Sequence, residues 1–167
     1  MRVLLAIDGS PYADAAVRAV VDRFNPASTE VRVLHAVEWM KEMPLCLQYG
    51  QGEAAAHDVV ASRDQSFKRA KLLVEDVAAQ LEFSGFSTTV ATPDADARHA
   101  IVDAARDWPA DLIVMGSHGR RGFDRMVLGS VAESVVRHSP CSVEIVRLPA
   151  AQIPAARPTE RTPARVR

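Results

Sequence analysis

The segment Leu112-Ile-Val-Met-Gly-Ser-His-Gly119 decides the fold, because a short apolar run opens directly onto a loop flanked by glycines. After nine further residues, Gly129-Ser130 begins a helix-like pattern of spaced valines. Amide groups in the first turn of a helix lack intrahelical partners, and the helix dipole favours negative charge there. Glycines let the backbone approach an anion without an intervening Cβ. The segment therefore predicts a buried strand, a loop and a helix start that together hold phosphate.

Apolar segments of strand length alternate with segments of helical periodicity along the rest of the chain. The nearly continuous apolar run Val3–Ile7 is typical of a strand buried on both faces. Ser10 and Pro11 suit the first positions of a helix, and Gly85 suits the end of a long one. The expected strands are 3–7, 31–37, 86–91, 112–115 and 142–146, and the expected helices begin at Ser10 or span 57–83, 97–107 and 130–138.

This alternation predicts a single α/β domain with a five-stranded, parallel, doubly wound sheet. The strand at 86–91 is the least apolar and is expected near one edge, and the last strand is expected at an edge as well. Ligands of such sheets bind at the carboxyl ends of the strands, where the strand order reverses. Asp8 and Gly116 end the first and fourth strands, so they are expected at the rim of a pocket.

Composition and charge narrow the classes of function. The 167 residues suffice for one ordinary domain, and their 48% hydrophobic and 25% charged content is typical of a soluble protein. A net charge of -1 argues against a nucleic-acid surface built on overall charge, and no apolar run is long enough to span a bilayer. Cys46 and Cys141 lie far apart, which indicates a reducing cytoplasm without a disulfide framework.

Residues 149–167 differ from the domain expected at 1–148. They hold four of the ten prolines and four arginines, with few large apolar side chains. Such a segment cannot offset the entropy cost of ordering, so a disordered basic tail is expected. A docking arm for an acidic partner is the alternative interpretation.

Two parts of the chain resemble the universal stress protein family. Val3-Leu-Leu-Ala-Ile-Asp-Gly-Ser10 is similar to the family's opening strand, and Asp111–Arg120 with Leu128–Glu133 is similar to its nucleotide-binding segment. The family pattern is Gly, two residues, Gly, nine residues, Gly, and then Ser or Thr. It is matched without gaps by Gly116, Gly119, Gly129 and Ser130. The likeness covers about residues 1–147.

The resemblance implies a Rossmann-like fold of the adenine nucleotide alpha hydrolase type, a homodimer, and a nucleotide-sensing role in the stress response. It implies the ATP-binding subgroup, because relatives that do not bind ATP lack these glycines. Hydrolysis is expected to be slow or absent, since no GxxxxGK[ST] loop and no evident water-activating base is present. The residues expected to bind Mg-ATP are Ala6, Asp8, Ala36, Met115, Gly116, Gly119, Arg120, Gly129, Ser130 and Val131.

Individual roles follow from the residue types and from the resemblance together. The helix start at 129–131 is expected to hold β- and γ-phosphate oxygens. Asp8 is expected to contact ribose or Mg²⁺, and the alternative is an acid that stabilises the following helix start. The family uses the Ala36 position to read the adenine edge through its backbone, while Met115 would supply an apolar wall. Ordinary core packing is the alternative for Ala6, Ala36 and Met115.

Other features of the sequence leave their roles open. Arg120, Arg121 and Arg125 are expected either to neutralise triphosphate charge or to lie in a solvated loop. His35 is expected to be a hydrogen-bonded core residue. We expect no acid–base role for His118, and we interpret the polar connection 38–56 as a candidate lid.

The last strand and the whole chain allow alternatives too. Val143 and Ile145 make the last strand a candidate homodimer edge, and the alternative is an edge covered by the tail. For the function, the alternatives are an adenylate-forming or adenylate-cleaving enzyme of the related α/β class, and an ATP-independent scaffold. The stress signal and the physiological nucleotide (ATP, AMP or cyclic AMP) do not follow from the sequence.

Overall fold

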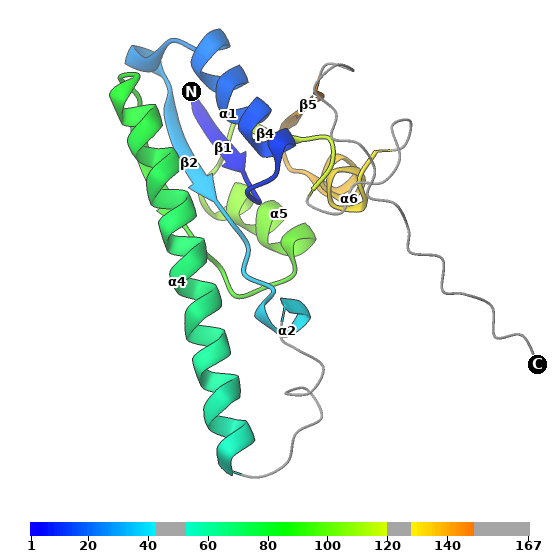
Figure 1. The fold of residues 1–167 in the computed structure, drawn as a ribbon. Coiled ribbons are helices and arrows are strands. Elements are labelled where there is room, and N and C mark those ends of the chain that lie inside the picture. The colour runs from blue at the N-terminus through cyan, green and yellow to red at the C-terminus, as the bar shows by residue number, and fades with distance from the viewer. Residues whose placement is uncertain (43–52, 120–127, 149–167) are drawn as a thin grey trace, which may run out of the picture.

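Five parallel strands form the sheet in the order β3-β2-β1-β4-β5 (Figure 1). The computed structural model describes residues 1–42, 53–119 and 128–148. The strands are β1 Arg2–Ala6, β2 Glu30–Leu34, β3 Ser87–Ala91, β4 Leu112–Gly116 and β5 Ser142–Val146. The strand order reverses between β1 and β4, as predicted for a doubly wound sheet. The carboxyl ends of these two central strands are therefore the expected place for a ligand.

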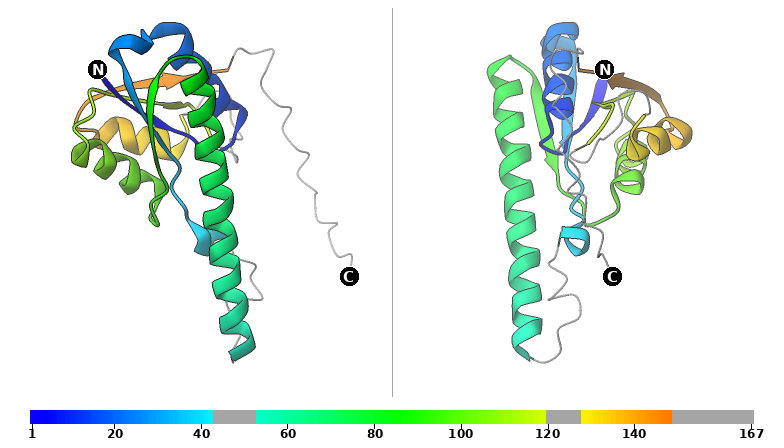
Figure 2. Two further views of the ribbon diagram at one scale, coloured as in Figure 1. Left: turned by 90° about the vertical axis from the view of Figure 1, so that its left-hand side faces the viewer. Right: turned by 45° about the vertical axis from the view of Figure 1, so that its right-hand side comes forward.

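Helices cover both faces of this sheet (Figure 2). They are α1 Pro11–Arg23, α2 Trp39–Glu42, α4 Glu53–Phe83, α5 Ala97–Asp107, α6 Ser130–His138 and the short 3-10 helix Pro26–Ser28. Helices α1 and α4 pack on one face, and α5 and α6 pack on the other. The amino-terminal half of α4 runs past the end of the sheet in every view (Figures 1 and 2).

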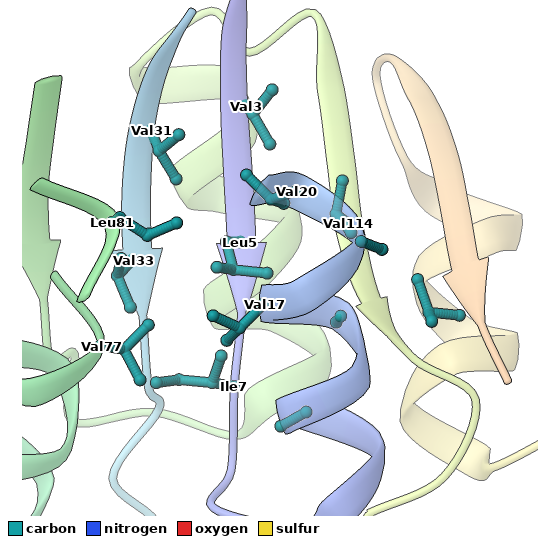
Figure 3. Close-up of a cluster of buried hydrophobic side chains, with 14 of the residues drawn as sticks. Val3, Leu5, Ile7, Val17, Val20, Val31, Val33, Val77, Leu81 and Val114 are labelled. Atoms are coloured by element: carbon teal, nitrogen blue, oxygen red, sulfur yellow. The ribbon is translucent and has the colours of Figure 1, made fainter. Parts of the chain in front are cut away.

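The core has two halves because successive strand residues point to opposite faces. Val3 and Leu5 of β1 pack with the apolar stripes of α1 and α4, as Figure 3 shows for Val17, Val20 and Leu81. The intervening residues of β1 pack instead with α5 and α6. The continuous apolar character of the central strands thus follows from burial on both sides.

Most of the predicted elements agree with the structure, and the differences lie at their ends. Helices α5 and α6 and strand β5 have the predicted bounds. The long helix begins at Glu53 rather than 57, and α2 forms within the connection that was expected to be irregular. Strand β2 ends at Leu34 rather than 37, because its ladder with β1 stops there. The remaining connection at 43–52 and the tail at 149–167 lie outside the described residues.

Capping residues set where two helices begin and end. The Ser10 hydroxyl accepts a hydrogen bond from the Ala13 amide at 3.3 Å, so α1 starts at the carboxyl end of β1. Gly85 ends α4 with a φ of 90°, and the next amide, of Phe86, bonds to the Leu81 carbonyl at 3.0 Å. This left-handed cap is the geometry that favours glycine. Across the described residues, no helix has the length and apolar character needed to cross a membrane.

Candidate functional site

A cavity of about 640 Å³ opens at the carboxyl ends of β1, β2 and β4. Its volume lies within the range of small-molecule sites, roughly 300–1,000 Å³. The polar side chains that line it come from both helical layers and the loops between them: Asp8, His35, Glu38, Arg69, His118 and Ser130. The cavity therefore offers apolar walls with a small number of placed polar groups.

Most of the residues that the sequence predicted for the site line this cavity. They are Ala6, Asp8, Ala36, Met115, Gly116, Gly119, Ser130 and Val131. Gly129 is not among the lining residues. It is the N-cap residue of α6, directly before Ser130. Arg120, Arg121 and Arg125 lie outside the described residues. The carboxyl ends of three strands and the start of α6 thus meet around one space.

Ser117, which the sequence did not single out, anchors the glycine loop. It is 2% exposed, and its amide donates to the Val146 carbonyl at 2.8 Å. Its own carbonyl accepts from the Gly129 amide at 2.9 Å. These two bonds join the end of β4 to β5 on one side and to the start of α6 on the other. A small polar residue between two glycines gives no sequence signal for such a role.

The three motif glycines are close to protein atoms before any ligand is considered. A Cβ on Gly116 would lie 2.8 Å from the backbone carbon of Tyr12 in α1. A Cβ on Gly119 would lie 2.7 Å from the Asp8 carboxylate, and one on Gly129 would lie 3.0 Å from the Ser117 carbonyl oxygen. Gly116 therefore lets α1 approach β4, whereas Gly119 makes room for the carboxylate of Asp8.

Two helix starts lie at the cavity, and they differ in whether carboxylates hydrogen-bond to their first backbone amides. At α5, the Glu38 carboxylate accepts from the Ala97 amide at 3.0 Å, and the Asp96 carboxylate accepts from the Arg98 amide at 2.9 Å. The hydrogen bond and the charge of Asp96 raise the pKa of Arg98 above its ordinary value. At α6, no side chain of the described residues caps the helix. Only the α6 start therefore leaves its amides available for an external anion.

The backbone at the end of β2 also presents unpaired groups to the cavity. The amides of His35 and Val37 donate to the Ala91 and Pro93 carbonyls on the β3 side, at 3.0 and 2.8 Å. The residue between them, Ala36, faces the β1 side and lines the cavity. Within the described chain, neither its N–H nor its carbonyl has a hydrogen-bond partner. This pair of groups suits the donor and acceptor edge of a heterocyclic base.

The Asp8 carboxylate lies beside Gly119 of the glycine loop. Its Oδ1 accepts from the Ser10 amide at 3.1 Å, and its Oδ2 faces Gly119. No group of three or more His, Cys, Asp or Glu residues suited to a metal ion occurs in the part of the chain that the structure describes. One carboxylate together with phosphate oxygens and water is a ligand set that suits Mg²⁺.

Two basic side chains at the cavity have distinct surroundings. His118 bonds through Nδ1 to the Ser117 hydroxyl at 3.1 Å, and its ring lies 5.2 Å from that of Tyr12. Its Nε2 is buried without a hydrogen-bond partner among the described residues. Arg69 of α4 is exposed and bonds only weakly to the Gln65 carbonyl, at 3.4 Å, and it forms no ion pair with any described residue.

Sequence reasoning missed Glu38 and Arg69 at the cavity. Glu38 lies four residues beyond the end of β2, and Asp8 lies two residues beyond the end of β1, so the same rule about carboxyl ends of strands would have found Glu38. Arg69 lies in the middle of a long helix. Nothing in its sequence position separates it from its solvent-facing neighbours.

The family model of the universal stress protein family matches residues 1–147. The chain is 31% identical to universal stress protein A homolog 2 of Coxiella burnetii over 88% of its own length and 94% of the relative's. The chain therefore belongs to the universal stress protein family, which confirms the resemblance. The solved structure of hypothetical protein MJ0577 matches with a TM-score of 0.76 and 25% identity, over 89% of this chain and 96% of that one.

Two further solved structures share the fold and hold adenine nucleotides. A universal stress protein family protein from Arabidopsis thaliana, with AMP bound, has a TM-score of 0.63 and 14% identity, over 93% of this chain and 96% of its own. A universal stress protein in complex with cAMP has a TM-score of 0.59 and 24% identity, over 87% and 96%. At these identities the matches show the common fold.

Proposed function

We propose that this protein binds ATP in the cavity at the carboxyl ends of β1, β2 and β4, and that it acts as a nucleotide-sensing regulator. One observation carries the proposal: a single cavity joins an uncapped helix start to an unpaired backbone donor and acceptor. The first suits phosphate and the second suits a base edge. Two proteins of the same fold with AMP or cAMP bound add support.

The capping of the two helices gives the nucleotide a direction. Phosphates lie at the start of α6, because residues 130–132 line the cavity and the helix start has no side-chain cap. They avoid the start of α5, because Glu38 and Asp96 place two carboxylates there. The base lies at Ala36 at the end of β2. Ala6 and Met115 then form the apolar floor between the two ends.

Mg²⁺ fits the Asp8 side of this arrangement. One carboxylate, phosphate oxygens and water form the ligand set that Mg²⁺ commonly takes. When bound, the ion would neutralise part of the triphosphate charge. Asp8 itself stays oriented by the Ser10 amide, so that its second oxygen is directed toward Gly119.

The chemistry that this proposal assigns is binding with slow or no hydrolysis. The sequence holds no GxxxxGK[ST] loop of the kind used in phosphoryl-transfer sites. The carboxylates of Asp8 and Glu38 each accept a hydrogen bond from a backbone amide, which fixes their orientation.

A second copy of the chain is proposed to pair at β5, giving a homodimer. Strand β5 pairs with β4 and, among the described strands, with no other. The side chains of Val143 and Ile145 are half-buried against the second half of the core. The groups available to a partner are therefore those of the β5 backbone.

Mass spectrometry of material released from the purified protein tests the proposed function. The expected result is an adenine nucleotide in amounts approaching one per chain. The Gly119→Val variant should release much less, because its side chain would displace the Asp8 carboxylate. A protein that carries no nucleotide and acquires none after incubation with ATP and Mg²⁺ would overturn the proposal.

A further inference from the structure

The side chain of His35 makes an unusual bond to the strand beside it. Its Nδ1 lies 2.8 Å from the Ile7 carbonyl oxygen, and the residue is 9% exposed. A carbonyl oxygen only accepts hydrogen bonds, so Nδ1 must carry the proton. The imidazole is thereby held in one orientation and one tautomer, at the wall of the cavity.

This bond replaces one that the parallel ladder would otherwise make. The Ile7 amide donates to the Leu34 carbonyl at 2.9 Å, in the regular pattern between β1 and β2. In that pattern the Ile7 carbonyl would next accept from the Ala36 amide. The His35 side chain donates to this carbonyl instead. The Ala36 amide has no partner among the described residues, and Ala36 lines the cavity.

We propose that His35 is a positioning residue that keeps the Ala36 amide unpaired within the protein, so that this amide can donate a hydrogen bond to the ligand. By occupying the Ile7 carbonyl, the imidazole ends the β1–β2 ladder one bond early and leaves a backbone donor at the cavity wall. The inference rests on the proposed function for the identity of the ligand, a base with an acceptor on its edge. The hydrogen-bond arrangement of His35, Ile7 and Ala36 does not depend on the proposed function.

Two substitutions separate this role from simple packing. His35→Phe keeps a ring in the core but removes the donor, so the Ile7 carbonyl becomes free to accept the Ala36 amide. His35→Asn places an amide nitrogen near the position of Nδ1 and should restore the donor. His99→Phe is the matched control, because His99 is exposed on α5 and does not line the cavity.

Amide hydrogen exchange at Ala36 is the first measurement, and it needs no nucleotide. We expect His35→Phe to slow exchange at this amide by about tenfold or more, as a new hydrogen bond protects it. Exchange should stay as in the wild type in His35→Asn and His99→Phe. Unchanged exchange at Ala36 in a folded His35→Phe protein would overturn the proposal.

Adenosine affinity is the second measurement, and it uses the same proteins. His35→Phe should raise the Kd for adenosine by about tenfold, which corresponds to the loss of one hydrogen bond, and His35→Asn should recover most of that loss. If the wild type binds adenosine and His35→Phe binds it equally well, this inference alone fails. If the wild type binds no adenine nucleoside or nucleotide, the proposed function fails.

The tautomer of His35 in the wild-type protein gives a test that no folding defect can obscure. Imidazole ¹⁵N chemical shifts distinguish a proton on Nδ1 from one on Nε2. The proposal requires the proton on Nδ1 in the neutral ring. A neutral His35 with its proton on Nε2 would overturn it, because Nδ1 could then not donate to Ile7.

Discussion

At the scale of single residues, the glycines of the motif have different structural roles. Gly116 adjoins backbone atoms of α1, which cannot move without moving the helix. Gly119 adjoins the end of a flexible carboxylate, which can rotate away. The first glycine therefore belongs to the stability of the fold, and the second belongs to the geometry of the site. The sequence motif alone treats the two alike.

Gly116→Ala is expected to destabilise the protein. Its Cβ would lie 2.7–2.9 Å from the Cβ, carbon and oxygen of Tyr12, so α1 must shift from β4. Forcing such overpacking costs roughly 1–3 kcal/mol. Thermal unfolding should show a melting temperature lower by about 2–12 °C, given the size of the chain. An unchanged melting temperature would mean that α1 and β4 do not approach as closely as described.

Gly119→Ala is expected to act on binding through Asp8. The new methyl group displaces the carboxylate, so the affinity for Mg-ATP should fall by about tenfold. Asp8→Ala removes the obstacle together with the carboxylate. In the double variant the two losses should therefore be clearly less than additive, as calorimetry of all four proteins would reveal. Additive losses would show that the two positions do not act on each other.

The site could be predicted at residue level only where a residue carries a local signal. Asp8 and Gly116 follow apolar runs, so the rule for doubly wound sheets locates both. Ser117 carries no such signal, because its importance lies in bonds to Val146 and Gly129 from distant parts of the chain. His35 was expected in the core, yet its ring also reaches the cavity.

At the scale of elements, the starts of α5 and α6 make two parts of the cavity wall electrostatically different, because carboxylates cap α5 and no side chain of the described residues caps α6. Helices α5 and α6 were both predicted with their observed bounds. Their difference in capping was not predicted, because Glu38 reaches α5 from a loop 59 residues earlier in the chain. Helical periodicity carries no information about tertiary contacts of this kind. Helix α2 was not predicted because four residues are too few to show a helical period.

Arg69 of α4 is expected to strengthen nucleotide binding. It is the one Lys or Arg that lines the cavity within the described residues, and it has no ion pair there. Arg69→Gln should weaken ATP binding by about threefold to tenfold at low salt, with a smaller loss at high salt. Lys68→Gln removes the same charge from the adjacent exposed position, which does not line the cavity. Equal losses in both variants would point to overall charge rather than a contact.

At the scale of the whole molecule, the sheet order follows from the alternation of strands and helices. Strands β3 and β5 occupy the two edges, as expected from their weaker hydrophobicity and from chain order. The central strands could be predicted because burial on both faces demands continuous apolar runs. The cavity volume and the proposed direction of the ligand could be derived only from the structure, because they depend on how four elements meet.

Val143→Pro tests the proposed homodimer at β5. The Val146 carbonyl bonds to Ser117 beside β4, so the backbone groups of alternate residues, Val143 and Ile145, point to the free edge. Proline at 143 removes an outward N–H without breaking the ladder with β4. Light scattering should then give a monomer of 18.1 kDa in place of a dimer. A dimer that persists would locate the interface elsewhere.

The proposed binding of adenine nucleotides in the cavity at the strand ends can be measured by isothermal titration of nucleotide-stripped protein with ATP and Mg²⁺. We expect one site per chain with a dissociation constant of about micromolar order, equivalent to roughly 8 kcal/mol. We also expect no multiple turnover of ATP during the titration. The absence of measurable binding by correctly folded, stripped protein would show that the cavity is not an adenine-nucleotide site.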